Sequence, residues 1–158
     1  MTLRAATEHD VPLILRFIRE LAEYERLAHE CVATEESVRE TLFGARPYAE
    51  VIVAEEDGEP AGFALFFHNY STFLARAGIY LEDLYVRPEM RGRGVGKKLL
   101  ARLAAIAVER NCGRLEWSVL DWNEDAIRFY RSLGAKPQDE WTVYRVTGDA
   151  LRELAGAG

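Results

Sequence analysis

Apolar positions near the start of the chain recur with the spacing of an amphipathic helix. The residues that recur at three- and four-residue intervals are Val11, Ile14, Leu15, Ile18, Leu21 and Ala22. Thr7 precedes them as an N-cap, and Asp10 occupies the capping-box position three residues later. The pattern therefore predicts a helix that begins after Thr7 and runs to about Tyr24-Glu25.

Two shorter elements flank this helix. Leu3–Ala6 predicts a short opening strand. Thr34 has the character of a second N-cap, with Ser37 three residues on, and Gly44 is a helix-ending glycine. These signals predict a second helix from Thr34 to Leu42.

Short apolar runs bounded by turn residues predict strands in the rest of the chain. The predicted strands are Val51–Ala54, Ala61–Phe67, Ile79–Val86, Leu115–Leu120 and Trp141–Val146. Asp57-Gly58 is a hairpin signal, whereas Ser71–Gly78 is predicted to be irregular. Pro88 ends the third run because proline cannot donate to a strand ladder. Helices at about Val95–Arg110 and from Glu124 to Leu133 complete the pattern.

The order of these elements indicates one α/β domain with a central sheet and helices on its faces. The chain has 158 residues, 49% hydrophobic and 29% charged, which is the balance of a folded domain with a single core. No internal repeat, low-complexity stretch or linker interrupts it. We therefore predict one domain over residues 1–158.

Composition narrows the classes of function. No apolar run reaches the length of a membrane span, and no apolar stretch follows a positive start, so we expect a soluble protein without a signal peptide. Cys31 and Cys112 are too few for a disulfide scaffold, which favours the cytoplasm. Three scattered histidines argue against a metal site. A net charge of −6 argues against nucleic-acid binding.

One glycine-rich turn between a strand and a helix carries a local excess of positive charge. Its residues are Arg91, Gly92, Arg93, Gly94, Val95, Gly96, Lys97 and Lys98. Glycines bring backbone amides close to a bound group, and the helix start favours an anion, so the turn indicates a phosphate-bearing ligand. The glycine spacing fits neither the P-loop nor the dinucleotide fingerprint. The simpler alternative is a turn that only lets the strand meet the helix.

The same residues resemble a known family. The run from Arg91 to Gly96 matches the R/Q-x-x-G-x-G/A loop of the GNAT N-acetyltransferases, which bind acetyl-CoA through its pyrophosphate. The segments 20–25, 80–86 and 122–135 resemble the diamine (spermidine/spermine) branch of that family. The resemblance implies a mostly antiparallel, splayed sheet and acetyl transfer to a primary amine.

The resemblance also assigns cofactor-binding positions. The strand before the turn is expected to hold the pantetheine arm and the thioester oxygen through its backbone, and the turn to hold the pyrophosphate. The residues implied are Leu84, Tyr85, Val86, Arg91, Gly92, Arg93, Gly94, Val95, Gly96, Lys97, Asn123 and Ala126. Asn123 is also explained as a helix N-cap.

Catalysis is assigned to a tyrosine and a carboxylate. Tyr130 matches the family's general acid, because a phenol stays protonated at pH 7 and can donate to sulfur; alternatively, it only packs beside Phe129. Glu82 is expected to act on the amine, directly or through water. Since neighbouring strand residues point to opposite faces, Glu82 and Asp83 are not expected to act as a pair on one proton. The implied substrate site comprises Tyr24, Glu25, Glu82, Asp83 and Trp117.

The substrate class is narrowed by a departure from the family. The polyamine enzymes carry a tryptophan and an acid where this chain has Ser71–Arg76, and Arg76 would repel a long polycation if it pointed inward. A shorter amine, a thialysine-like amino acid or an aminoglycerol-type substrate therefore remains open beside a polyamine or a diamine. A protein N-terminal or lysine acetyltransferase and a non-catalytic CoA-binding module are the alternatives. The family also implies a homodimer that shares its substrate sites. In this chain the last strand and the C-terminal segment are the candidates to pair with a second copy.

Overall fold

A five-stranded sheet forms the centre of residues 1–120. The computed structural model describes all 158 residues, and they divide into two units, 1–120 and 121–158, which we describe separately. The strands lie side by side in chain order and are β1 (Thr2–Ala5), β2 (Glu50–Glu56), β3 (Glu59–Ser71), β4 (Arg76–Val86) and β5 (Leu115–Trp117). The first four are antiparallel to their neighbours, and β5 is parallel to β4. The expected mixed, mostly antiparallel sheet is confirmed.

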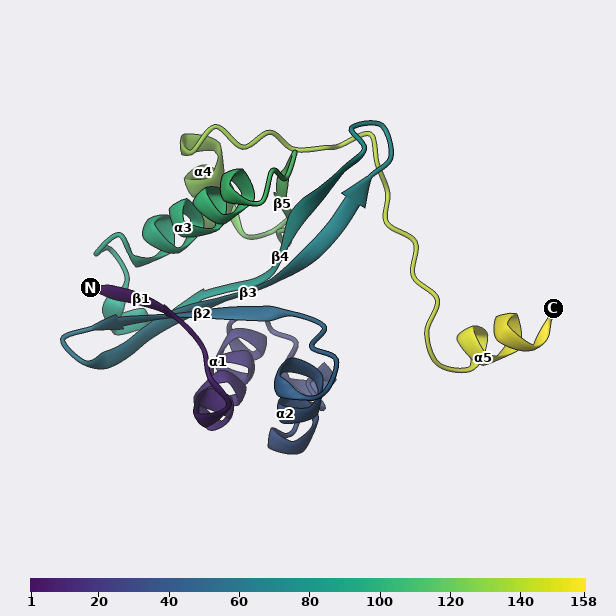
Figure 1. Cartoon of the computed structure of the whole chain (residues 1–158), viewed down its shortest axis with the longest axis horizontal. Coiled ribbons are helices and arrows are strands. Elements are labelled where there is room, and N and C mark those ends of the chain that lie inside the picture. The colour runs from purple at the N-terminus through teal and green to yellow at the C-terminus, as the bar shows by residue number, and fades with distance from the viewer. The chain divides into compact units, whose positions relative to one another are not determined.

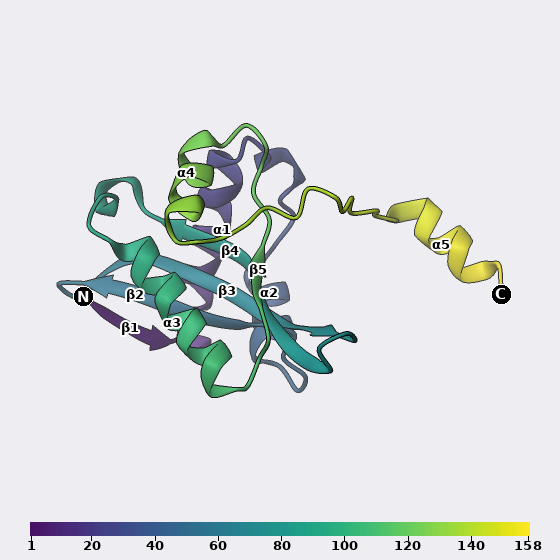
Figure 2. The ribbon, with the colours of Figure 1, turned by 90° about the horizontal axis from the view of Figure 1, so that it is seen from above.

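Helices cover both faces of this sheet (Figure 1). Helices α1 (Val11–Tyr24) and α2 (Glu35–Phe43) pack on one face, and α3 (Val95–Glu109) packs on the other. The view from above shows α3 crossing the strands obliquely (Figure 2). Three 3₁₀ turns, Glu8–Asp10, Ala28–Glu30 and Pro88–Met90, join these elements. The predicted helices are confirmed, except that the first begins with a 3₁₀ turn.

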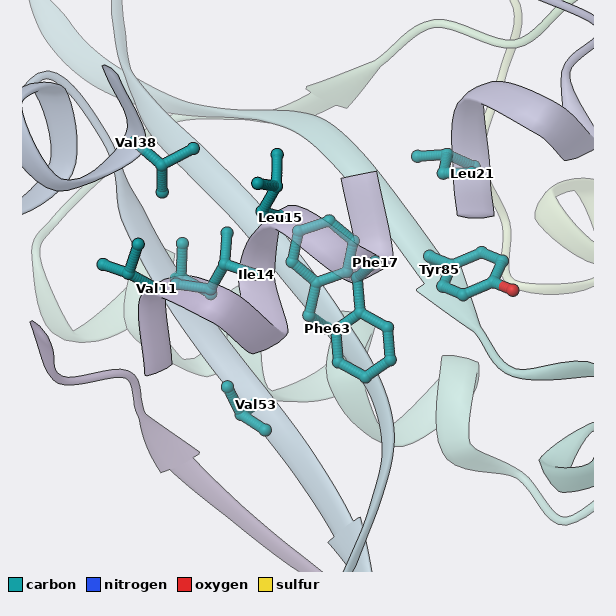
Figure 3. Packing of buried hydrophobic residues seen from close by; sticks show 10 residues of the cluster. Val11, Ile14, Leu15, Phe17, Leu21, Val38, Val53, Phe63 and Tyr85 are labelled. Atoms are coloured by element: carbon teal, nitrogen blue, oxygen red, sulfur yellow. The ribbon is translucent and has the colours of Figure 1, made fainter. Parts of the chain in front are cut away.

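The core beneath α1 follows from the predicted apolar spacing. Phe17 of α1 stacks on Phe63 of β3 with the ring centroids 5.3 Å apart, and Tyr85 of β4 completes the aromatic group at 5.9 Å from Phe17 (Figure 3). Val11 and Ile14 are also fully buried. Burying a large apolar side chain stabilises a fold by about 1.5–3 kcal/mol, so this cluster fixes α1 against β3 and β4.

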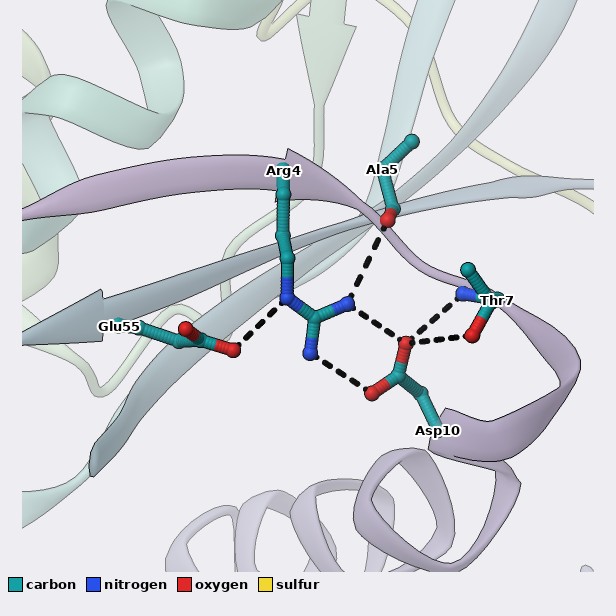
Figure 4. Close-up of polar contacts among 5 residues, drawn as sticks. All are labelled: Arg4, Ala5, Thr7, Asp10 and Glu55. Carbon is teal, nitrogen blue, oxygen red and sulfur yellow. Dashed lines mark hydrogen bonds and ion pairs between the residues drawn. The ribbon is translucent and has the colours of Figure 1, made fainter. Parts of the chain in front are cut away.

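The start of α1 is tied to the sheet by a buried carboxylate. Both oxygens of Asp10 accept hydrogen bonds from the Arg4 guanidinium at 2.8 Å, and the Thr7 amide donates to Asp10 Oδ2 at 2.8 Å (Figure 4). Arg4 also donates to Glu55 at 2.7 Å. These bonds, above all those from Arg4, lower the pKa of Asp10. The predicted capping interaction at Thr7 is confirmed.

The two hairpins of the sheet differ in how well the sequence predicts them. Asp57 and Gly58 form the predicted two-residue turn, both with positive φ (52° and 79°). The prediction that Ser71–Gly78 is irregular is right only for residues 72–75, which form the turn, and wrong at both ends, because β3 extends to Ser71 and β4 begins at Arg76. Pairs such as Tyr70 with Ala77 continue the ladder almost to the tip. Cross-strand pairing thus overrides a weak local strand signal.

The second unit, residues 121–158, contains two helices, α4 (Glu124–Ser132) and α5 (Gly148–Gly156). The predicted strand Trp141–Val146 is wrong, because these residues pair with no strand of the chain. A strand needs a ladder partner for its backbone groups, and an alternating pattern alone cannot supply one. Helix α5 was not predicted from the sequence. None of the helices combines the length and apolar character needed to cross a lipid bilayer.

Candidate functional site

The sheet opens between β4 and β5. These strands pair only from Ile79–Leu115 to Leu81–Trp117, and β5 ends at Trp117. The part of β4 from residue 82 to residue 86 keeps its β3 partners but has no β5 partner. The expected splay is therefore confirmed. It leaves one edge of β4, at Leu84, Tyr85 and Val86, without a ladder partner on the β5 side.

One extra residue in β4 reverses the direction of its side chains. Leu81 lies opposite Phe66 on β3, but Asp83 lies opposite Leu65, so Glu82 has no β3 partner. Residues directly opposite each other share a sheet face, and neighbours on β3 use opposite faces. Asp83 therefore lies on the face covered by α1, and the alternation is interrupted at Glu82.

Three carboxylates meet at this interruption. Burial, followed by repulsion from Glu82 and Glu25, raises the pKa of Asp83 to about 6. Burial and repulsion from Glu82 also raise the pKa of Glu25, the C-cap residue that directly follows α1. The regular alternation from which we argued that Glu82 and Asp83 cannot act together is wrong at this point in β4. A cluster of interacting acids in a partly buried place suits a cationic group.

The glycine-rich turn presents a series of backbone amides without partners. Gly92 and Gly94 have φ of +78° and +80°, a conformation that favours glycine. Helix α3 begins directly afterwards, and the amides of residues 92–97 make no hydrogen bond to other backbone groups. A Cβ added at Gly92 or Gly94 would meet no atom within 4 Å, so open space lies over the turn. These amides and the exposed cations Arg93, Lys97 and Lys98 suit an anion.

Arg91, which opens this turn, contacts the ends of α1 and β4. Its Nε donates to the Val86 carbonyl at 2.9 Å. Its guanidinium carbon lies 4.9 Å from the ring centroid of Tyr24 and 5.9 Å from that of Tyr85. Tyr24, expected in the amine site, therefore also contacts the proposed cofactor loop. The ring of Tyr85 is buried, so only the backbone of this residue is available to a ligand at the open edge.

The remaining predicted residues belong to the second unit or to the end of β5. The Asn123 side chain accepts a hydrogen bond from the Ala126 amide at 3.3 Å, which is the expected N-cap of α4. The ring of Tyr130 packs beside Phe129 with the centroids 5.6 Å apart. Trp117 is the last residue of β5 and is half-buried. The roles of these residues in binding and catalysis stay predictions.

Two residues change the sequence-based interpretation of the site. Arg76 is the first residue of β4, six positions before Glu82, which corresponds to about 20 Å along a strand. Its stem approaches the Gly113 position instead, so Arg76 gives no argument against a long polycation. Glu20, to which sequence reasoning gave no role, has a buried Oε2 without a hydrogen-bond partner and lies within electrostatic range of Tyr85. The only signal for Glu20 in the sequence was the resemblance of segment 20–25 to the diamine branch.

Comparison with known proteins identifies the fold's family. The sequence profile of the acetyltransferase (GNAT) family matches residues 17–135, which include the C-terminal half of α1, the acid cluster, the glycine-rich turn and α4. The chain belongs to the GNAT acetyltransferase family. Its members use acetyl-CoA as co-substrate, and this GNAT chain is accordingly an N-acetyltransferase. The resemblance to the diamine branch of the GNAT family is also confirmed.

Two relatives and one solved structure illustrate which proteins this GNAT chain is similar to. A thialysine N-epsilon-acetyltransferase of Bos taurus is 44% identical, over 98% of this chain and 96% of the relative. An L-ornithine N5-acetyltransferase of Arabidopsis thaliana is 37% identical, over 96% and 86%. The structure of an integron cassette protein from the mobile metagenome of V. cholerae is 29% identical, with a TM-score of 0.83 over 99% of this chain and 98% of that one.

Proposed function

We propose that this chain transfers an acetyl group from acetyl-CoA to the side-chain primary amine of a small cationic molecule, such as a thialysine-like amino acid, ornithine, a diamine or a polyamine. The observation that carries this proposal is the cluster of Glu25, Glu82 and Asp83 beside the open edge of β4. The relatives that act on thialysine and ornithine support a compact substrate of this kind.

The cofactor-binding role rests on the glycine-rich turn and the unpaired edge of β4. The amides of residues 92–97, with Arg91, Arg93 and Lys97 around them, fit a pyrophosphate that carries negative charge. The edge at Leu84, Tyr85 and Val86 offers backbone donors and acceptors to an extended pantetheine arm, in the manner of a strand. Asn123 and Ala126 complete the proposed set. Bound acetyl-CoA supplies the activated acyl group.

Acetyl transfer requires a proton to leave the amine and a proton to reach the sulfur. The bound ammonium group first loses one proton to become a nucleophile. A new C–N bond then forms as the C–S bond breaks, the nitrogen gives up its second proton, and the departing thiolate gains one, so that one proton in total is released to solvent. We assign the deprotonation of the ammonium to Glu82, directly or through water, and the protonation of sulfur to the hydroxyl of Tyr130. Amides of β4 then stabilise the negative charge on the carbonyl oxygen.

The acid cluster also argues for a small amine over the two alternatives. An acetyltransferase for protein N-termini or lysines needs an open peptide groove, whereas these acids gather around one place that a single ammonium group can fill. A CoA-binding module without turnover has no use for a carboxylate cluster in which burial and neighbouring charges raise the pKa of Asp83 and Glu25. Trp117 and Tyr24 are assigned to the walls of the amine site.

We further infer that the active form is a homodimer. Three large apolar side chains near the C-terminus are almost fully exposed: Trp141 (81%), Val143 (83%) and Tyr144 (93%). A group of large apolar side chains that is exposed together usually marks an interaction surface. A second copy of the chain gives this segment a surface to cover it. Free Cys31 and Cys112 agree with a reducing, cytoplasmic setting.

A substrate panel tests the proposed function. The purified chain is incubated with acetyl-CoA and, in turn, thialysine, ornithine, lysine, putrescine, spermidine and a lysine-containing peptide, and free thiol is measured. We expect the highest kcat/KM with one of the small cationic amines. A preference for the peptide would favour the protein acetyltransferase, and binding of acetyl-CoA without thiol release on any amine would favour the binding module.

A further inference from the structure

Arg91 joins three parts of the first unit that the sequence separates widely. Its Nε donates to the carbonyl of Val86 at the end of β4, at 2.9 Å. Its guanidinium lies over the ring of Tyr24, the last residue of α1, at 4.9 Å from the centroid. Arg91 itself opens the glycine-rich turn. A single side chain thus connects the proposed pyrophosphate loop with the ends of α1 and β4.

These contacts leave most of the guanidinium available to an anion. Arginine carries five N–H donors and stays charged at any physiological pH. One donor is used on Val86, and the guanidinium carbon lies over the Tyr24 ring in a cation–π contact, which uses no conventional hydrogen bond. Arg91 is therefore able to bind a phosphate oxygen while it keeps its contact with Tyr24.

The end of α1 is also connected to the acid cluster. Glu25 directly follows Tyr24, and its carboxylate interacts with the other two acids: burial and repulsion from Glu82 raise the pKa of Glu25, and the charge of Glu25 adds to the burial and the Glu82 charge that raise the pKa of Asp83. The end of α1 therefore presents the Tyr24 ring to the loop that binds an anion and the Glu25 carboxylate to the place that binds a cation. Arg26, the next residue, has a positive φ of 62°, so the helix ends sharply here.

We propose that the Arg91–Tyr24 contact couples the binding of acetyl-CoA to the binding of the amine. An anion on the loop holds Arg91, Arg91 holds the Tyr24 ring, and the end of α1 then keeps Glu25 in position for the substrate cation. This inference rests on the proposed function. Each ligand reduces the motion that the other must restrict, so each raises the affinity of the other by the same factor.

Calorimetry on the whole chain measures this factor without turnover. CoA, which has no acetyl group to transfer, is titrated alone and with saturating thialysine, and thialysine is titrated with and without CoA. We expect each ligand to tighten the other about 5-fold or more in the wild type, at the lower end of typical coupling factors. Tyr24→Leu should bring the factor close to one, and Tyr24→Phe, which keeps the aromatic face, should retain it.

A second variant separates coupling from simple damage to the fold. Arg91→Lys keeps the charge but loses the flat group and its fixed donors, so CoA binding should weaken moderately while the coupling factor falls to about one. Melting temperatures without ligand should stay near the wild-type value, because Tyr24 is 40% exposed. An unchanged coupling factor in Tyr24→Leu and Arg91→Lys, or a factor of one in the wild type, overturns the inference. A wild type that binds no CoA contradicts the proposed function itself.

Discussion

Asp83 lies opposite Leu65 in the β3–β4 register, whereas Leu81, only two positions earlier, lies opposite Phe66 on the other face of the sheet. A regular strand would place residues 81 and 83 on the same face. The extra residue, Glu82, moves Asp83 to the α1 face, where Glu25 ends the helix. A local irregularity of one residue thereby assembles an acidic site from two elements that are 58 residues apart in the chain.

The raised pKa of Asp83 makes stability depend on pH. An acid whose pKa is raised on folding binds more protons in the folded state, so stability falls as pH rises from the unfolded value near 4 to the folded value of about 6. Asp83→Asn removes this dependence. We expect the variant to gain on the order of 2 kcal/mol relative to the wild type between pH 4 and pH 7, measured by urea unfolding.

The same substitution at an exposed position serves as the control for this prediction. Asp57 lies in the tight turn between β2 and β3 and is exposed, and asparagine tolerates its positive φ. Asp57→Asn should leave the pH dependence of unfolding as in the wild type. Parallel pH profiles for Asp83→Asn and the wild type would contradict the assigned environment of Asp83.

Amine binding should become tighter as pH rises through about 6. A bound ammonium group favours the ionised form of Asp83, so binding below this pH must release a proton. The amine itself stays charged, since its pKa is about 10. Calorimetric titration of thialysine between pH 5 and pH 8 should show this rise, and Asp83→Asn should flatten it. Equal slopes for both proteins would show that Asp83 does not face the substrate.

The glycine-rich turn should not tolerate an acidic side chain when acetyl-CoA binds. Gly94→Glu places a negative charge and extra volume in the open space over the amides of the turn, so the rise in melting temperature caused by acetyl-CoA should disappear. Gly58→Glu is the matched control, since Gly58 has nearly the same φ (+79° against +80°) and equally open surroundings in the β2–β3 hairpin. It should lose similar stability and keep the full shift with acetyl-CoA.

Much of the first unit could be predicted because its sequence signals are local. The spacing of Val11, Ile14 and Leu21 alone places α1, and the Asp57-Gly58 pair alone places a hairpin. The acid cluster could only be predicted in part. Glu25, Glu82 and Asp83 were all candidates, but their mutual repulsion depends on a register shift that involves Leu65 and Phe66 of another strand. Cross-strand register has no signature in the sequence of β4.

In the C-terminal segment, by contrast, prediction from the sequence failed. Trp141–Val146 has the composition of a strand, and the prediction failed because no strand of the same chain pairs with it. Helix α5 was missed because its nine residues carry few apolar positions, Leu151 and Leu154 among them. Such a short helix has little stability of its own in water. Such patterns indicate that a segment needs another surface to pack against, but they do not identify that surface.

Oligomeric state should depend on the exposed segment. Trp141→Asp and Val143→Asp place a charge where the proposed dimer buries an apolar side chain, so sedimentation should shift from about twice the 17.9 kDa chain mass toward the chain mass. Phe73→Asp is the control, because Phe73 is 97% exposed in the turn between β3 and β4 and does not belong to this segment. A monomeric wild type, or a dimer that survives both substitutions, would contradict this interface.

The role of Tyr130 gives the sharpest prediction. Tyr130→Phe keeps the ring, its packing beside Phe129 and its place in α4, and removes only the hydroxyl. Loss of a general acid typically lowers the rate about 10²–10⁴-fold. Because the thiolate charge develops only in the transition state, kcat should fall while the dissociation constant of acetyl-CoA changes little.

Two controls make this outcome specific to the proton donor. Tyr70→Phe removes a hydroxyl from an exposed tyrosine of β3 and should leave kcat unchanged. Glu82→Gln should instead lower kcat/KM for the amine and move the acidic limb of the pH–rate profile, because the proposed role of Glu82 is to act on the substrate amine. If Tyr130→Phe keeps more than about a third of the wild-type kcat while chemistry limits the rate, far above the range for a lost general acid, then Tyr130 only packs against Phe129. The thiolate would then take its proton from water.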